Sequence, residues 1–296
     1  MVEVSISVPV YKSKIYADWV YNSLYEFTPM LQSGEAEFFF IANDPQPELL
    51  RHLQAKGYKH YVNYNPPMSK EQMFALGYGW PEYMRRVYRG YNEAIRRSQG
   101  NIVVLINSDH YFSPHWLENL LKHVTKETIV CSQLVERTHP KHGTYPGAYH
   151  CDCGDSPLTF DKEKFLSFAD KVRKDAIRPG GLSYMPCAFY RDVAFRVGLY
   201  PEGNIAGKSF KRVVKWGDEA FFDKLAAIGV KPITALDSIV YHIKEGEMDE
   251  GSIRQRPDVL LLLGIRRRII RMLSVMGAGK LQRKIEEVIH HDEYRH

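Results

Sequence analysis

The sequence predicts an α/β protein with a mostly parallel central sheet and helices on both of its faces. Three observations support this prediction. Short apolar runs that fit buried strands alternate with segments of helical periodicity, as in doubly wound sheets. The run Ile102–Ile106 contains only Ile, Val and Leu, which is typical of a strand buried on both faces. Polar residues directly follow several of these runs, at the carboxyl edge where open α/β sheets bind ligands.

The composition is ordinary for a globular protein: of the 296 residues, 44% are hydrophobic and 25% are charged, and the formal net charge is +5. No apolar run reaches the roughly 18 to 20 residues that a membrane-spanning helix needs. The N-terminal residues do not resemble a signal peptide, and four cysteines without such a signal fit a reducing compartment. We therefore expect a cytoplasmic protein, with peripheral contact at the inner membrane face as a further hypothesis.

The first half of the chain carries strand patterns separated by helical ones. Each helix ends at residues that stop helices: Thr28 and Pro29 after the first, Gly57 after the second and Gly100 after the third. The predicted elements are a strand from Val4 to Pro9, a helix from Trp19 to Phe27, a strand from Glu37 to Ala42, a helix from Pro47 to Lys56, a strand from Tyr58 to Tyr64, a helix from Glu82 to Ser98 and a strand from Asn101 to Ile106. The segment Met68–Pro81 is expected to be a functional loop.

The second half continues the alternation but contains longer irregular stretches. The predicted elements are a helix from Ser113 to Val124, a strand from Thr128 to Leu134, a helix from Phe160 to Lys174, a strand and a short helix within 182–198, a helix from Glu219 to Ile228 and a strand from Lys231 to Leu236. Thr138–Ser156 is expected to be irregular. Pro201–Phe210, with two glycines, is expected to be a mobile loop.

The tail differs from the rest because it is basic, with arginines interleaved among apolar residues. We predict one catalytic domain over residues 1–250, with a nucleotide-binding half (1–125) and an acceptor-binding half (126–250), followed by a basic helical C-terminal extension over residues 251–296. The extension is expected either to pack on the catalytic domain or to lie on an anionic membrane surface. Nucleic acid is not an expected partner, since no recognised binding module accompanies the charge.

Asp109 stands just beyond the apolar strand, in the sequence NIVVLINSDH. Its carboxylate oxygens suit Mg²⁺ or Mn²⁺ carrying a nucleotide diphosphate. An Asp in this place could equally cap the helix that starts near Pro114. The strand by itself does not decide between these two interpretations.

Several short motifs occur in the order found in family 2 glycosyltransferases of the GT-A fold, and the chain resembles that family over roughly residues 3–243. The motifs are VSISVPVYK, YNEA followed by Gly100, INSDH, CAFYRDVAFRVGLYPEG, WGDEAFFDKLAAIGVK and VYH. The resemblance implies a GT-A type fold with a Rossmann-like sheet. It also implies metal-dependent transfer of a sugar from a UDP- or GDP-linked donor to a glycan, a lipid-linked molecule or another hydroxyl acceptor.

The resemblance further implies which residues bind each part of the substrates. Asp109 and His242 are the expected ligands of Mn²⁺ or Mg²⁺. The expected donor-binding residues are Pro9, Tyr11, Asn43, Asp44, Arg89, Asn92, Asn107 and Asp109. The expected acceptor-binding residues are Trp216, Gly217 and Tyr184.

An inverting transferase needs a carboxylate that takes the proton of the acceptor hydroxyl. By motif position Glu219 is the candidate base and Asp218 an acceptor ligand, although the two roles could be exchanged. Acidic residues at a helix N-terminus are also common capping residues, because the helix dipole favours negative charge there. The aromatic ring of the preceding Trp216 suits a sugar and favours the functional interpretation.

The chain departs from the family pattern at two places. Asn107 replaces the first Asp of the Asp-x-Asp motif, so Asp109 brings the only charge there. The second strand ends in Asn43 and Asp44 rather than the usual base-reading Asp, which leaves the donor nucleotide open. A non-catalytic protein that binds a sugar nucleotide or a carbohydrate, and a sugar nucleotidyltransferase, therefore remain alternative functions.

A further possibility concerns His150, Cys151 and Cys153, which could bind a structural zinc ion together with nearby histidines. Their Cys-x-Cys spacing differs from the strong Cys-x-x-Cys pairs, and no second pair lies at a suitable distance. A loop on the acceptor side is the preferred interpretation of this segment.

Overall fold

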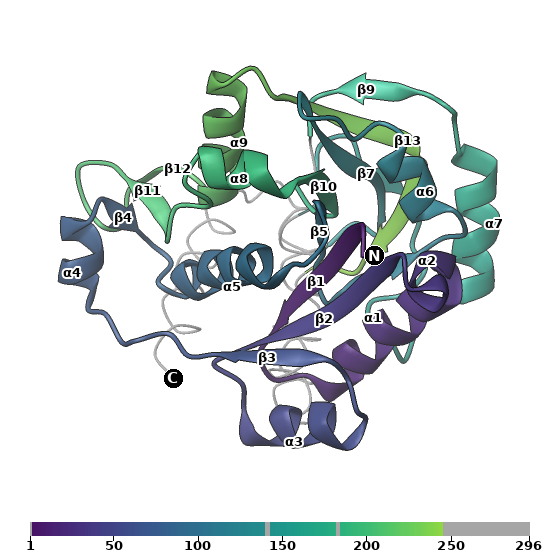
Figure 1. Ribbon diagram of the computed structural model, residues 1–296, viewed down its shortest axis with the longest axis horizontal. Helices are drawn as coiled ribbons and strands as arrows, with labels where there is room; N and C mark the ends of the chain where they lie inside the picture. Colours follow the sequence, from purple (N-terminus) through teal and green to yellow (C-terminus); the bar gives the residue numbers. More distant parts are fainter. Residues whose placement is uncertain (1, 140–142, 182–183, 245–296) are drawn as a thin grey trace, which may run out of the picture. The chain divides into compact units, whose positions relative to one another are not determined.

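The computed structural model describes residues 2–139, 143–181 and 184–244 (Figure 1). The predicted C-terminal extension, 251–296, lies outside the described residues, so its helical and membrane-binding character stays a prediction. In the described part of the chain, every helix is too short or too polar to cross a lipid bilayer.

The central sheet mixes parallel and antiparallel pairs. Its strand order is β3 (His60–Asn63), β2 (Ala36–Asn43), β1 (Val4–Val10), β5 (Ile102–Leu105), β10 (Cys187–Tyr190), β7 (Thr128–Glu136), β13 (Lys231–His242) and β6 (His110–Phe112). The neighbours from β3 to β5 are parallel, as are β7 and β13, whereas β10 and β6 run antiparallel to their neighbours. The short strands β8 (Tyr149–His150) and β9 (Ile177–Pro179) pair with β7 and β13. The predicted α/β fold with a mostly parallel sheet is confirmed.

The two faces of the sheet pack against different helices because side chains alternate along each strand. In β2, Phe38 and Phe40 join one apolar cluster, and Phe39 and Ile41 join the other. The first cluster is covered by α1 (Lys14–Phe27), α3 (Pro47–Ala55) and α6 (Trp116–Leu121). The second is covered by α5 (Tyr83–Arg97), α8 (Arg191–Arg196) and α9 (Gly217–Ala227). Two further helices are α2 (Pro29–Ser33) and α7 (Lys162–Val172).

Two strands differ from the prediction and both matter for the site. Strand β13 continues past Leu236 to His242, with a register shift between Ala235 and Ile239. Strand β6 follows Asp109 directly and pairs with the end of β13, so that His110 lies opposite His242. The sequence did not show β6 because three residues are too few to display a strand period.

The two segments predicted as loops each contain short regular elements. Met68–Pro81 contains α4 (Lys70–Ala75) and β4 (Tyr78–Gly79), and the predicted mobile loop contains β11 (Asn204–Ala206). With β12 (Val213–Lys215) these strands form a three-stranded sheet in the order β12–β11–β4. A Cβ on Gly79 would lie 2.8 Å from the Phe210 carbonyl oxygen, so glycine permits this close packing. The prediction failed because glycines that serve close backbone contact look like loop residues in sequence.

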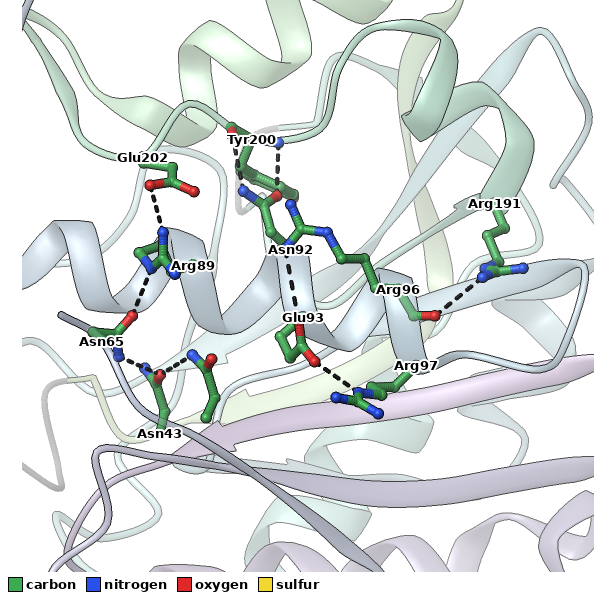
Figure 2. Close-up of polar contacts among 11 residues, drawn as sticks. Asn43, Asn65, Arg89, Asn92, Glu93, Arg96, Arg97, Arg191, Tyr200 and Glu202 are labelled. Carbon is green, nitrogen blue, oxygen red and sulfur yellow. Dashed lines mark hydrogen bonds and ion pairs between the residues drawn. The ribbon is translucent and has the colours of Figure 1, made fainter. Parts of the chain in front are cut away.

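Asn92 of helix α5 forms hydrogen bonds with Tyr200, in the segment that precedes β11 (Figure 2). Its side-chain amide donates to the Tyr200 carbonyl oxygen at 3.0 Å and accepts from the Tyr200 N–H at 2.9 Å. Asn92 is almost fully buried. The Asn92 amide therefore satisfies both backbone polar groups of Tyr200, and its predicted contact with the donor stays a prediction.

We expect Asn92→Ala to lower the free energy of unfolding by about 2–4 kcal/mol, because it leaves the buried N–H and C=O of Tyr200 unpaired. Urea unfolding followed by circular dichroism measures this change. Asn22→Ala, at an exposed position on α1, is the matched control and should be near neutral. An unchanged stability in Asn92→Ala would show that the two bonds contribute nothing.

Candidate active site

Asp109 and His242 meet at the edge of the sheet where β6 pairs with β13. His242 Nε2 lies 3.5 Å from Asp109 Oδ2, and both residues are buried. His242 Nδ1 lies 2.7 Å from Glu136 Oε1, at the end of β7. The other Glu136 oxygen accepts from the Tyr145 N–H at 2.7 Å. The imidazole is thus held between two carboxylates, and Glu136 fixes its orientation.

The charges around His242 decide its protonation. Burial opposes the imidazolium form, but the carboxylates of Asp109 and Glu136 outweigh burial and raise the pKa of His242 to about 9. At neutral pH the ring therefore carries a proton on each nitrogen. His242 would hold a metal ion through Nε2 only after this nitrogen has lost its proton, while Nδ1–H would keep its bond to Glu136.

His110 and Asn107 complete this edge. The Asn107 N–H donates to His110 Nδ1 at 3.2 Å, so the ring proton of neutral His110 lies on Nε2. Burial, and then the neighbouring His242, lower the pKa of His110 to about 3, which keeps the ring neutral. The Tyr91 hydroxyl donates to Asn107 Oδ1 at 2.5 Å, leaving the Asn107 amide N–H groups for a ligand.

The donor set at this edge fits a divalent transition metal. Asp109, His110 and His242 are the three residues that the described part of the chain brings together with potential ligand atoms within 4.8 Å of one another. A carboxylate with an imidazole suits Mn²⁺, and the carboxylate–histidine pair of Glu136 and His242 is the usual support of a metal-bound histidine. In the hydrogen-bonded arrangement His110 offers a proton and no free lone pair, so Asp109 and His242 are the fitting ligands.

A second polar group lies at the ends of β2 and β3 (Figure 2). Asn43 Oδ1 accepts from the amides of Asn63 and Asn65, at 2.8 and 2.9 Å, and its own amide donates to the Arg86 carbonyl oxygen. Both Asp44 oxygens accept from Asn65. These bonds fix the orientation of Asn43 and Asp44, and their predicted contact with the donor stays a prediction.

Two arginines of α5 face the same region. The Arg86 guanidinium lies 5.0 Å from the centre of the exposed Tyr11 ring, beyond Pro9 at the end of β1. Arg89 donates to Asn65 at 2.9 Å and pairs with Glu202 at 2.7 Å. A cavity of about 240 Å³ adjoins this group, and its lining includes Asp44, Asn65, Tyr83, Arg85 and Arg86.

The two predicted carboxylates of the WGDE motif differ in environment. Glu219 accepts from the Trp216 N–H at 3.0 Å and so caps α9. Burial raises the pKa of the Asp218 carboxyl to about 6, although the hydrogen bond that it accepts from the Glu219 N–H at 2.9 Å opposes this rise. A carboxylate with a pKa near neutrality is the better proton acceptor. The environment of the two residues thus favours exchanging the roles that motif position had suggested.

The expected acceptor residues lie at helix α9 or pack against it. Trp216 is exposed, and Tyr184 packs edge-on against Phe222 of α9. A side chain on Gly217 would collide with the buried ring of Tyr88, so the backbone approaches this ring closely. The Gly217 N–H also bonds to the Tyr88 hydroxyl and to Asn204 Oδ1, at 3.0 and 3.1 Å. These contacts fix the start of α9 and the position of Asp218.

Among the described residues, no third potential metal ligand gathers with Cys151 and Cys153. Cys151 and Cys153 are free thiols with sulfur atoms 3.4 Å apart, and His150 Nδ1 lies 3.3 Å from the Thr138 hydroxyl. His142, one of the histidines considered for zinc, lies outside the described residues. The segment instead packs beside the candidate metal site, because the Cys151 N–H donates to the Glu136 carbonyl oxygen.

Sequence reasoning missed Glu136, Tyr91 and Arg86. Glu136 is the last residue of an apolar strand, and Asp109 lies just beyond the end of another. A polar residue at the end of a buried strand was the signal that could have identified Glu136. Nothing in the sequence distinguishes Tyr91 from the other tyrosines of α5. Arg86 faces Tyr11 only because α5 packs beside β1.

The sequence model described as glycosyl transferase family 2 matches residues 82–189. The match covers 108 of the 296 residues, and we call these residues the family 2 segment. This family 2 segment includes Asp109 and Glu136, and the resemblance that the motifs indicated is confirmed. No curated protein sequence matches the chain significantly.

Two solved structures show the GT-A fold of the chain around its family 2 segment. GalNAc-T7, solved with UDP, GalNAc and Mn²⁺, is 14% identical with a TM-score of 0.50, and the match covers 82% of this chain and 44% of that one. TarS 1-349 of S. aureus is 13% identical with a TM-score of 0.50, and the match covers 84% of this chain and 62% of that one. The chain therefore spans less than two thirds of the length of either structure. At these identities the likeness concerns the fold alone.

The charge on His242 should make stability depend on pH. Its folded pKa of about 9 exceeds the ordinary value of 6.5, so the stabilisation is complete below pH 6.5 and is lost as the pH rises through 9. We expect the difference in unfolding free energy between the wild type and His242→Gln to shrink over this interval by on the order of 3 kcal/mol. Urea titrations across this range measure it. The control is the exposed His115→Gln, for which the difference in unfolding free energy from the wild type should not change over this pH range. A difference for His242→Gln that also does not change would refute the raised pKa.

Proposed function

We propose that the protein is a metal-dependent glycosyltransferase that moves a hexose from a nucleotide-diphosphate sugar to a hydroxyl acceptor with inversion. The observation that carries the proposal is the approach of Asp109 to His242, supported by Glu136, at the carboxyl edge of the sheet. The family 2 segment supports the same reaction class. Structures with the same fold include one with UDP and Mn²⁺, which supports such a donor and cofactor here.

The residues around this edge would bind the donor. Asp109 and His242 would hold Mn²⁺ or Mg²⁺, which supplies a Lewis acid for the negative charge of the leaving diphosphate. Asn107, oriented by Tyr91, offers amide N–H groups to a donor oxygen. Tyr11 would offer an aromatic ring and Arg86 a positive charge to the nucleoside diphosphate. Pro9 precedes this pair on β1, and the cavity that Asp44 and Arg86 line lies beside it. Arg89 acts by holding Asn65 in place.

Asp218 would act as the general base. Its carboxylate would take the proton of the acceptor hydroxyl while that oxygen bonds to the anomeric carbon and the nucleoside diphosphate leaves. Trp216 would contact the acceptor, Glu219 would keep α9 capped, and Gly217 lets the chain pass close to Tyr88. A glycan or a lipid-linked sugar is the proposed acceptor. The cytoplasmic location expected from the sequence stays a prediction.

Mn²⁺ together with UDP or GDP should raise the melting temperature of the protein by about 5 °C or more at roughly 100-fold excess over the dissociation constant. We expect Asp109→Ala to lose this shift, because one of the two metal ligands is gone. Asp170→Ala, an exposed carboxylate on α7, is the control and should keep it. A full shift in Asp109→Ala would refute the metal site. A shift without turnover on any acceptor would favour the non-catalytic alternative.

Asp218→Asn should lower kcat for sugar transfer by about 10²- to 10⁴-fold, because the general base is lost. The nucleotide-dependent melting shift should remain, since the donor side is untouched. In the wild type kcat/KM should rise with pH through a midpoint near 6, where Asp218 loses its proton, and this step should be absent in Asp218→Asn. Asp223→Asn, on the outer side of the same helix, is the matched control. A larger loss in Glu219→Gln than in Asp218→Asn would return the role of base to Glu219.

A further inference from the structure

The three-stranded sheet β4–β11–β12 carries an exposed surface that the proposed chemistry does not use. We call this surface the hairpin tip. It consists of Leu76, Trp80, Lys208, Lys211, Arg212 and Val214. Leu76 and Val214 expose 60% and 59% of their area and Trp80 exposes 39%, so three large apolar side chains of this region reach solvent.

Backbone contacts bring these residues together. The Gly77 carbonyl oxygen, next to Leu76, accepts from the Ala206 N–H at 2.8 Å, and the Trp80 N–H donates to the Phe210 carbonyl oxygen at 2.8 Å. A Cβ on Gly207 would lie 2.9 Å from Val214 Cγ1. The apolar side chains thus lie beside the turn between β11 and β12, which carries the three cations.

The charged side chains of the hairpin formed by β11 and β12 are all positive. From Asn204 to Lys215 the sequence has four basic residues and no acidic one. Lys215 pairs with Asp223, whereas Lys208, Lys211 and Arg212 are exposed and form no ion pair with another described residue. Cations beside exposed aliphatic and Trp side chains match the interface of a bilayer, where apolar groups enter the headgroup region and cations contact anionic lipids. A soluble acidic glycan would use the cations but not Leu76 or Val214.

We propose that the hairpin tip docks on the surface of a membrane that contains anionic lipids. Strand β12 leads directly into Trp216 and Asp218, so docking would place the proposed acceptor side next to the bilayer surface. The presentation of a lipid-linked acceptor therefore rests on the proposed function. The docking itself does not, since it needs neither donor nor metal.

Vesicle flotation of the full chain tests the docking without any turnover. We expect binding to vesicles with about one third phosphatidylglycerol, weakening as salt rises, and little binding to phosphatidylcholine alone. The variant Lys208→Ala/Lys211→Ala/Arg212→Ala should lose about 100-fold in partition coefficient, at roughly fivefold for each cation. Leu76→Ser/Val214→Ser should also weaken binding although its charge is unchanged.

The control variant Lys171→Ala/Lys174→Ala/Lys231→Ala removes the same charge from exposed positions and should bind as the wild type does. Two of these lysines lie on or just beyond α7, on the opposite side of the sheet from β11 and β12 (Figure 1). Melting temperatures check that each variant is folded.

Equal vesicle binding by Lys208→Ala/Lys211→Ala/Arg212→Ala and by the wild type would overturn the proposal and assign binding to another part of the chain. Displacement of the protein from vesicles by oligogalacturonate, with Leu76→Ser/Val214→Ser behaving as the wild type, would identify the tip as an acidic-glycan site and overturn it as well. Asp109→Ala should bind vesicles as the wild type does. A failure of the proposed function and a failure of the docking proposal would therefore give different results.

Discussion

The position of His242 depends on the two neighbours of strand β13. Pairing with β7 aligns His242 with Glu136, and pairing with β6 sets it opposite His110, one residue beyond Asp109. Two buried carboxylates therefore meet one imidazole at the edge of the sheet. Such a group of charges is costly to bury unless every member has a partner, and here each carboxylate faces the ring. The rest of the candidate site is arranged around this contact.

Helix α5 links that edge to the proposed acceptor side. Tyr91 bonds to Asn107 beside the metal site, Tyr88 bonds to the start of α9 beside Asp218, and Asn92 fastens the helix to Tyr200. One helix thus sets the spacing between the group that would bind the leaving diphosphate and the group that would accept a proton. Rigid support of this kind is what positioned catalysis requires.

The sequence predicted most of the central sheet, its flanking helices and the identity of several site residues. Asp109, His242 and Asp218 were named from motifs, and the structure places the first two in contact. Other predicted site residues also bond within the fold: Asn92 and Asn43 through their amides, and Glu219 as a cap of α9. Their roles in binding substrates stay predictions. A sequence motif identifies the type of residue at a site. How many hydrogen bonds that residue makes within the fold depends on backbone groups from distant parts of the chain. The small sheet was missed because its strands are two or three residues long.

What the sequence alone determined is the local pattern: the apolar runs that become buried strands, the helices between them and the polar residues at the strand ends. These follow from side-chain periodicity and from capping, which act over a few residues. Only the tertiary structure decided which strand ends meet, since β6 and β7 reach β13 from distant parts of the chain. The partnership of Glu136 with His242, the raised pKa of Asp218 and the hairpin tip all depend on such long-range neighbours. Burial and charge around a residue come from the whole fold, and no local pattern records them.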